Sequence, residues 1–192
     1  MQYKNTPEAY GRIAKLLHWT VALLFLLAYA SVYYRHWFTE SKTPENWTAL
    51  QLHLSFGVTI AVFVLLRLVW KFMNTAPTPE PGTALEHLAA KLGHYTLYAV
   101  MIIMPITGYF GTGVATEFFF LFDISKFPDT ALYQFLIVDI LGTDFKTIEP
   151  TMDFIHKNVG GEWLVWILIL GHAAAALYHH FVKRDNTLKR ML

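Results

Sequence analysis

Histidine is the residue type whose number and spacing in this sequence point most directly to chemistry. Nine histidines occur in a chain of 192 residues that is 55% hydrophobic. Six of them fall within or beside long apolar runs, where an ionisable side chain costs free energy and marks a candidate site. By depth they form an outer layer of two and an inner layer of four: His53 and His156 outside, and His18, His94, His172 and His179 inside.

Two layers of paired imidazoles suit two b-type haems. Such a haem needs two axial nitrogens from facing helices and an apolar slot, and no covalent anchor. Small residues beside the histidines, such as Gly57 and Gly171, let a macrocycle approach the backbone. The 16 residues from His156 to His172 span about 24 Å if helical, which suits two haems stacked within one bilayer. The absence of cysteine excludes c-type haem, iron–sulfur clusters and disulfides.

Other readings of intramembrane histidines remain open at this point. A histidine can hydrogen-bond a neighbouring helix, relay protons or line a metal-ion path. A histidine-lined metal-ion or proton transporter is therefore the alternative of a different class, and a purely structural membrane anchor is a third. The transporter would carry no visible chromophore. His36 and His87 receive no role.

Four segments are long and apolar enough to position these histidines across a membrane. A span needs about 20 mostly apolar residues, and these runs do not alternate polar and apolar residues as barrel strands do. We therefore expect an all-α fold, an integral membrane four-helix bundle forming one domain over residues 1–192. The expected helices are 13–34, 47–71, 88–110 and 161–182.

A long connection, 111–160, separates the third and fourth expected helices. Its apolar stretch 131–141 is too short to span, so we expect an interfacial helix or a cap over the bundle.

Charge predicts the orientation of the bundle. An even number of spans places both termini on one side, and that side holds ten of the 15 basic residues. The positive-inside rule then places both termini in the cytoplasm. The five basic residues of the opposite side are Arg35, Lys42, Lys126, Lys146 and Lys157. Its ten acidic residues are Glu40, Glu45, Glu117, Asp123, Asp129, Asp139, Asp144, Glu149, Asp153 and Glu162.

Four motifs along the chain resemble the bacterial cytochrome b561 family, which is related to the cytochrome b subunits of membrane hydrogenases and formate dehydrogenases. The motifs are RIAKLLHW (12–19), LHLSFGVTI (52–60), AAKLGHYTLY (89–98) and GHAAAALYHHFVKRDNTLKRM (171–191). The resemblance implies four helices, two non-covalent b haems and exchange of electrons with the quinone pool of the bacterial inner membrane. Superoxide oxidation on the outer side, coupled to quinone reduction, is among the activities it implies.

Carried over residue by residue, the resemblance implies that His18 and His172 hold the inner haem iron and that His53 and His156 hold the outer one. His94 and His179 are then left to bind a quinone or a haem propionate. Basic residues of the inner side can neutralise propionates or simply satisfy the positive-inside rule; they are Arg12, Lys15, Lys91 and Lys183.

The spacing of the last two ligands departs from the family pattern. In the family the two histidines of the fourth helix are fourteen residues apart, nearly on one face. Here they are 16 apart, about 160° on an ideal α-helix. Gly160 and Gly161 lie between them, where the helix can break or bulge.

The acidic outer side bears on the electron donor. A net negative face slows the approach of the superoxide anion, so it favours a neutral donor or a cationic partner protein. Lys126, Lys146 and Lys157 can still form a local positive path. The expected partners are membrane lipid, a quinone and an outer-side donor protein, and we expect no nucleic acid.

Overall fold

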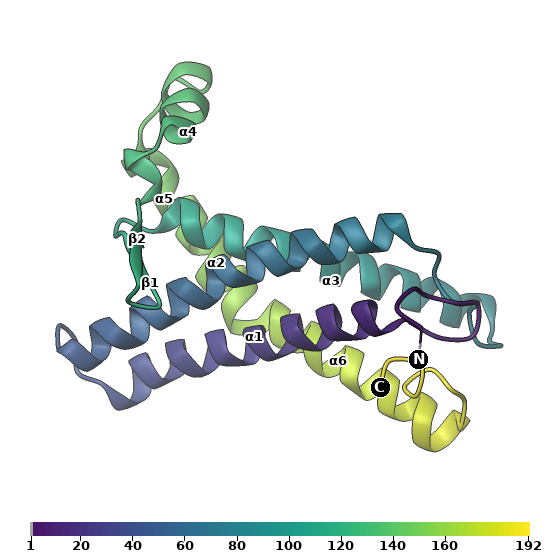
Figure 1. Cartoon of the computed structure of the whole chain (residues 1–192). Helices are drawn as coiled ribbons and strands as arrows, with labels where there is room; N and C mark the ends of the chain where they lie inside the picture. The colour runs from purple at the N-terminus through teal and green to yellow at the C-terminus, as the bar shows by residue number, and fades with distance from the viewer. Residues whose placement is uncertain (1) are drawn as a thin grey trace.

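Four long helices dominate the computed structural model, which describes residues 2–192 (Figure 1). Three are single α-helices: α1 (Arg12–Phe38), α2 (Pro44–Met73) and α3 (Ala84–Gly111). The fourth runs without interruption over Phe145–Lys183. It consists of α5 (Phe145–Asp153), the π-helix η3 (Phe154–Leu164), α6 (Val165–Tyr178) and the π-helix η4 (His179–Lys183). All four are long and apolar enough to cross a membrane, which confirms the all-α membrane fold.

Local sequence signals fix where these helices begin. Thr43 caps α2 by accepting a hydrogen bond from the Asn46 amide, and Pro44 occupies the first turn, where no amide proton is needed. Thr83 and Glu86 form a reciprocal capping box at the start of α3. In the middle of the bundle α1, α2 and α3 bury a common apolar core: Val21, Leu24, Ala28, Ile60, Val64 and Met101.

The expected start of the fourth helix, residue 161, is wrong. The helix begins at Phe145, after Asp144 accepts a hydrogen bond from the Thr147 amide at 2.9 Å. The two glycines do not end it, because Gly160 is buried against α3. A Cβ at Gly160 would overlap the Met104 sulfur, so the missing side chain permits close helix packing instead of a break.

A short hairpin fills the start of the connection between α3 and the fourth helix. Strands β1 (Thr116–Phe118) and β2 (Phe122–Ile124) pair antiparallel. The fully buried side chains of Gln51 and Ser55 on α2 hydrogen-bond hairpin backbone groups. These bonds satisfy non-helical backbone beside a membrane helix, where an unpaired polar group is costly.

The rest of the connection projects away from the bundle. It contains the 3-10 turn η1 (Phe127–Asp129), α4 (Ala131–Tyr133) and the π-helix η2 (Gln134–Ile140). Figure 1 shows α4 at the far end of this projection, well clear of α1, α2 and α6. The expectation of a cap over the bundle is therefore wrong.

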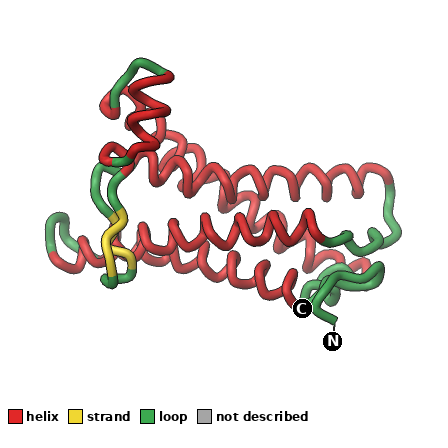
Figure 2. The backbone as a smooth tube through the Cα atoms, turned by 45° about the horizontal axis from the view of Figure 1, so that its top comes forward, coloured by secondary structure: helices red, strands yellow, loops and turns green. Residues whose placement is uncertain are grey.

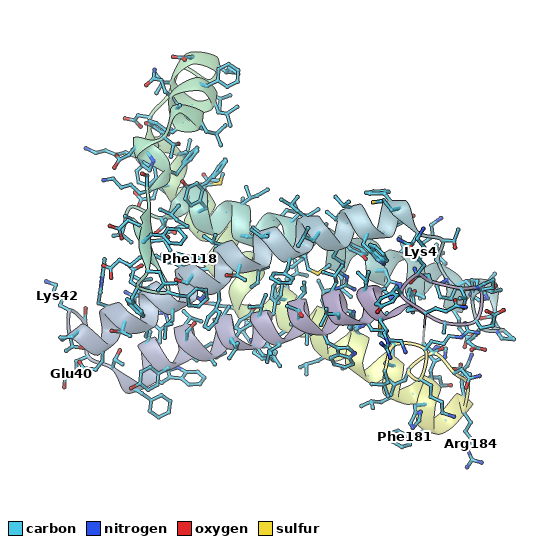
Figure 3. All side chains as sticks on the ribbon, in the orientation of Figure 1. Lys4, Glu40, Lys42, Phe118, Phe181 and Arg184 are labelled. Carbon is cyan, nitrogen blue, oxygen red and sulfur yellow. The ribbon has the colours of Figure 1, made fainter. Side chains whose placement is uncertain are left out.

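The two ends of the chain lie together at one end of the bundle in both views (Figures 1 and 2). Lys4 and Arg184 mark this end, and Glu40 and Lys42 mark the opposite end (Figure 3). The C-terminal segment 184–192 is tied down here. Arg190 pairs with Glu80 at 3.0 Å, and Trp19 donates to the Met191 carbonyl at 2.9 Å.

Candidate functional site

The outer histidines face each other across the bundle. His53 comes from α2 and His156 from η3, and their ring centres are 6.0 Å apart. Imidazole nitrogens bind first-row metal ions at about 2 Å and the ring centre lies about 1 Å beyond, so rings on opposite sides of one iron have centres about 6 Å apart. The observed separation fits a bis-imidazole haem.

Backbone carbonyls orient both outer rings. The Nδ1–H of His53 donates to the Ala28 carbonyl on α1, and that of His156 donates to the Met104 carbonyl on α3, both at 2.9 Å. A carbonyl only accepts, so each neutral ring carries its proton on Nδ1 and a lone pair on Nε2. This arrangement is typical of metal-ligating histidines, whose second nitrogen donates to a carbonyl or carboxylate.

The π-helix η3 accounts for the unusual spacing of 16 residues between His156 and His172. Because its hydrogen bonds run from i to i+5, each π turn takes up about one more residue than an α turn. The eight residues from His156 to Leu164 make nearly two such turns. The 16 residues therefore turn the helix through about the same angle as fourteen residues of an α-helix, which is just under four whole turns. The two histidines then lie nearly on one face.

Gly108 on α3 provides the space for the His156 ring. A Cβ at this position would lie 2.8 Å from the ring Cε1 and 3.1 Å from Nδ1. Such contacts are too close for a real side chain, so the ring can occupy its place only beside glycine. The same α3 turn supplies the Met104 carbonyl, and the two residues together fix the ring.

Three histidines meet at the inner end. The rings of His18 on α1 and His172 on α6 have centres 6.1 Å apart, and His94 on α3 lies 5.6 Å from His172. The His94 side chain is exposed, whereas His18 and His172 are half-buried. The separation between His18 and His172 is close to that of the outer pair.

Arg67 on α2 contacts the inner cluster. Its guanidinium donates to Nδ1 of His18 at 2.8 Å and lies 5.4 Å from the centre of the Tyr98 ring. A neutral His18 that accepts at Nδ1 carries its proton on Nε2. Iron binding at Nε2 therefore requires that proton to leave or Arg67 to move away from Nδ1, which distinguishes the inner pair from the outer one.

The helices do not all pack equally closely against one another. α1 packs mainly against α2, and α6 packs against α3. Large rings span from α1 to α6: the Trp166 indole donates to the Tyr33 hydroxyl at 2.7 Å and lies 4.7 Å from Tyr29. A Cβ at Gly57 or Gly171, beside His53 and His172, would meet nothing within 4 Å. The Nε2 lone pairs of His53 and His156 and the open face of Gly57 fit a haem at the outer end, whereas the inner end fits one only once His18 frees its Nε2.

His179 contacts the C-terminal segment and none of the inner histidines. Its Nδ1 lies 2.5 Å from a carboxylate oxygen of Asp185 and 3.3 Å from the Thr187 hydroxyl. Burial raises the pKa of the Asp185 carboxyl, but hydrogen bonds from His179 and Thr187 outweigh burial and lower that pKa to about 2. Asp185 is therefore an anion at neutral pH and holds the His179 ring in one orientation.

Several basic side chains that the sequence offered as partners of haem propionates, or as a local positive path, already contact other groups of the protein. Lys183 pairs with Glu86, Lys15 contacts the Leu192 carbonyl, and Lys91 lies 5.8 Å from the centre of the Tyr95 ring. On the outer side, Lys126 pairs with Asp129 at 3.8 Å and Lys157 with Asp153 at 2.5 Å. These outer pairs weaken the local positive path that the lysines were expected to form.

Sequence reasoning missed the groups that orient the ligands. Nothing in the sequence marks the Ala28 and Met104 carbonyls, because any residue has a carbonyl. Arg67 could have been found, since a charged residue within an apolar span marks a candidate site. Gly108 lies near the end of the third expected helix, where the sequence marks it only as a small residue.

Comparison with known proteins identifies the family. The family model described as prokaryotic cytochrome b561 matches residues 9–192. Cytochrome b561 homolog 2 of Escherichia coli K12 is 32% identical over 206 residues, covering 100% of this chain and 95% of the relative. The probable superoxide oxidase CybB of Yersinia pestis is 28% identical, covering 92% and 91%. The chain therefore belongs to the prokaryotic cytochrome b561 family, multi-pass bacterial membrane proteins that transfer electrons with b-type haem.

Proposed function

We propose that this protein carries electrons across the bacterial inner membrane through two b haems. His53 and His156 hold the outer haem iron, and His18 and His172 hold the inner one. The observation that carries the proposal is the pair of ring separations, 6.0 and 6.1 Å, in two layers of one bundle. His94 is less suited as a ligand because it lies on α3, which packs directly against α6.

The protein keeps the region between the two haem sites rigid and free of water. Each haem, when bound, carries one electron at a time. The apolar core of α1, α2 and α3 lies between the layers and excludes water and competing proton chemistry. Ala28, whose carbonyl binds His53, is ten residues from His18 on α1, so the layers are about 15 Å apart along the helix. This is shorter than the 24 Å that the His156–His172 spacing suggested.

We place quinone chemistry at the inner end, which also holds both termini and faces the cytoplasm. Reduction of a quinone takes up two electrons and two protons. His179 is suited to exchange a proton with a quinone, because Asp185 holds its Nδ1 and fixes the orientation of the ring. The exposed His94 beside His172 is suited to bind a quinone carbonyl.

The outer donor is neutral or cationic in this proposal. The outer side carries ten acidic residues, and two of its five basic residues are engaged in ion pairs. A partner protein that delivers electrons would make the chain a relay subunit. Direct oxidation of superoxide, coupled to quinone reduction, is the second candidate, and the name of the Yersinia relative favours it.

The transporter alternative has less support. Within residues 2–192, no group of three or more histidine, aspartate and glutamate side chains is placed to hold a metal ion.

The test is a reduced-minus-oxidised spectrum of the purified protein, with haem stoichiometry from the pyridine adduct. The expected result is a b-type signal at two haems per chain, falling to one in His53→Ala, with His36→Ala as the matched control. A colourless protein would overturn the proposal and favour the transporter. One haem in the unsubstituted chain would leave the inner or outer pair without its assigned role.

A further inference from the structure

The segment 127–144, here called the outer arm, runs across the direction of the membrane helices. It comprises η1, α4 and η2. It leaves the bundle near the outer end of α3 and extends sideways in both views (Figures 1 and 2). Because α1, α2 and α3 run along the membrane normal, an arm directed across them lies along the membrane plane, at the level of the outer interface.

The tip helix of the arm, Ala131–Ile140, is apolar around most of its circumference. Its exposed apolar side chains and that of the next residue are Leu132, Phe135, Val138, Ile140 and Leu141. Two of its polar side chains bond each other, because Gln134 Nε2 donates to an Asp139 carboxylate oxygen at 2.9 Å. The bonding residues are five apart, so the π-helical turn of η2 places them on one face.

The direction of the arm is fixed by packing at its base. Phe127 is completely buried and stacks on Phe110 with ring centres 4.0 Å apart. Tyr133 packs edge-on against Phe127 at 5.4 Å, and its hydroxyl accepts from the Phe145 amide at 2.9 Å. The tip is therefore held out beside the bundle by a rigid aromatic base.

We infer that the tip helix lies in the outer lipid–water interface, with its apolar side chains among the acyl chains beside the bundle. A helix in the lipid–water interface buries its apolar side chains at the boundary of headgroups and acyl chains and keeps a polar face toward water, and the face that carries Gln134 and Asp139 fits this arrangement. The polar ends of the tip, at Asp129 and Asp144, remain at the level of water. The arm is acidic, so its attachment rests on apolar burial and does not require anionic lipid.

The absence of cysteine from the chain makes a direct test simple. Phe135→Cys and Leu141→Cys, each carrying a nitroxide spin label, are reconstituted into phosphatidylcholine vesicles. Collision with oxygen, which concentrates in acyl chains, is compared with collision with a water-soluble nickel complex. Lys42→Cys at the outer end is the aqueous control (Figure 3), and Leu23→Cys on α1 is the acyl-chain control.

The expected result is that both tip labels collide with oxygen as the Leu23→Cys label does and are shielded from nickel. Nickel access equal to that of the Lys42→Cys label at both tip positions would place the helix in water and overturn the inference. Low access to both reagents with dipolar broadening between labels would instead mean contact with a second copy of the chain, which also overturns it. The haem spectrum plays no part in this readout.

Discussion

At the scale of single residues, the proposed outer haem site depends on atoms that would not themselves bind the iron. The His156 ring is held by one carbonyl and by the absence of one Cβ. Both features come from a single turn of α3 that contains Met104 and Gly108. The position of a ligand can therefore be tested without changing the ligand.

Gly108→Ala is predicted to lose the outer haem. Alanine favours the helix by about 0.5–1 kcal/mol over glycine, so the bundle should still form. The added Cβ displaces the His156 ring, which it would otherwise approach to 2.8 Å. Haem stoichiometry should fall from two to one. Gly93→Ala, on the same helix with nothing within 4 Å of its Cβ, is the control and should leave the outer haem signal intact.

Arg67→Gln is predicted to lower the midpoint potential of the inner haem. A nearby cation stabilises the state with the extra electron, and at an effective dielectric constant of about 20 the effect is tens of millivolts. A spectroscopic redox titration that resolves two components should show a lower midpoint potential for one component and an unchanged midpoint potential for the other. A rise instead of a fall would mean that Arg67 stabilises a deprotonated His18, since its Nδ1 accepts from the guanidinium.

At the scale of elements, hydropathy located every membrane helix but could not describe the fourth correctly. Residues 13–34, 47–71 and 88–110 lie within α1, α2 and α3, because length and apolar content determine a span. The sequence left a break or a bulge open at Gly160 and Gly161, and the structure has the bulge, as the π-helix η3. The two-residue excess between His156 and His172 was the visible sign of it.

Deletion of Asn158 and Val159 is predicted to retain both haems. Both side chains are exposed, and the deletion restores a spacing of about fourteen residues, which an α-helix places on one face. Deletion of Val159 alone should rotate His156 away and lose the outer haem. Loss in the double deletion and retention in the single one, measured by the pyridine adduct, would contradict the role assigned to η3.

At the scale of the whole molecule, charge divides the bundle into a basic end and an acidic end. The sequence predicted this division, and both termini lie at the basic end (Figure 3). The sequence could not predict the direction of the outer arm, because that depends on the aromatic base of Phe110, Phe127 and Tyr133. The apolar content of residues 131–141 alone did not distinguish an interfacial helix from a cap over the bundle.

The acidic end predicts opposite salt effects on donors of opposite charge. Between ionic strengths of about 0.01 and 0.1 M the screening length falls from about 30 to 10 Å. In vesicles with the outer side facing the medium, added salt should slow reduction by a ruthenium hexaammine cation and speed reduction by the dithionite anion. Stopped-flow traces give both rates. Equal slopes for the two reagents would remove the electrostatic argument for a cationic partner.

Helix α1 is one of two helices that connect the two proposed sites. α1 carries His18 itself and the Ala28 carbonyl that orients His53, and a helix is stiff along its axis. Electron tunnelling falls steeply with distance, so a gap fixed within one helix keeps its rate when neighbouring helices tilt. The fourth helix likewise carries a proposed ligand of each haem, His156 and His172, so transfer between the layers should be insensitive to bilayer thickness as long as these two helices keep their relative positions.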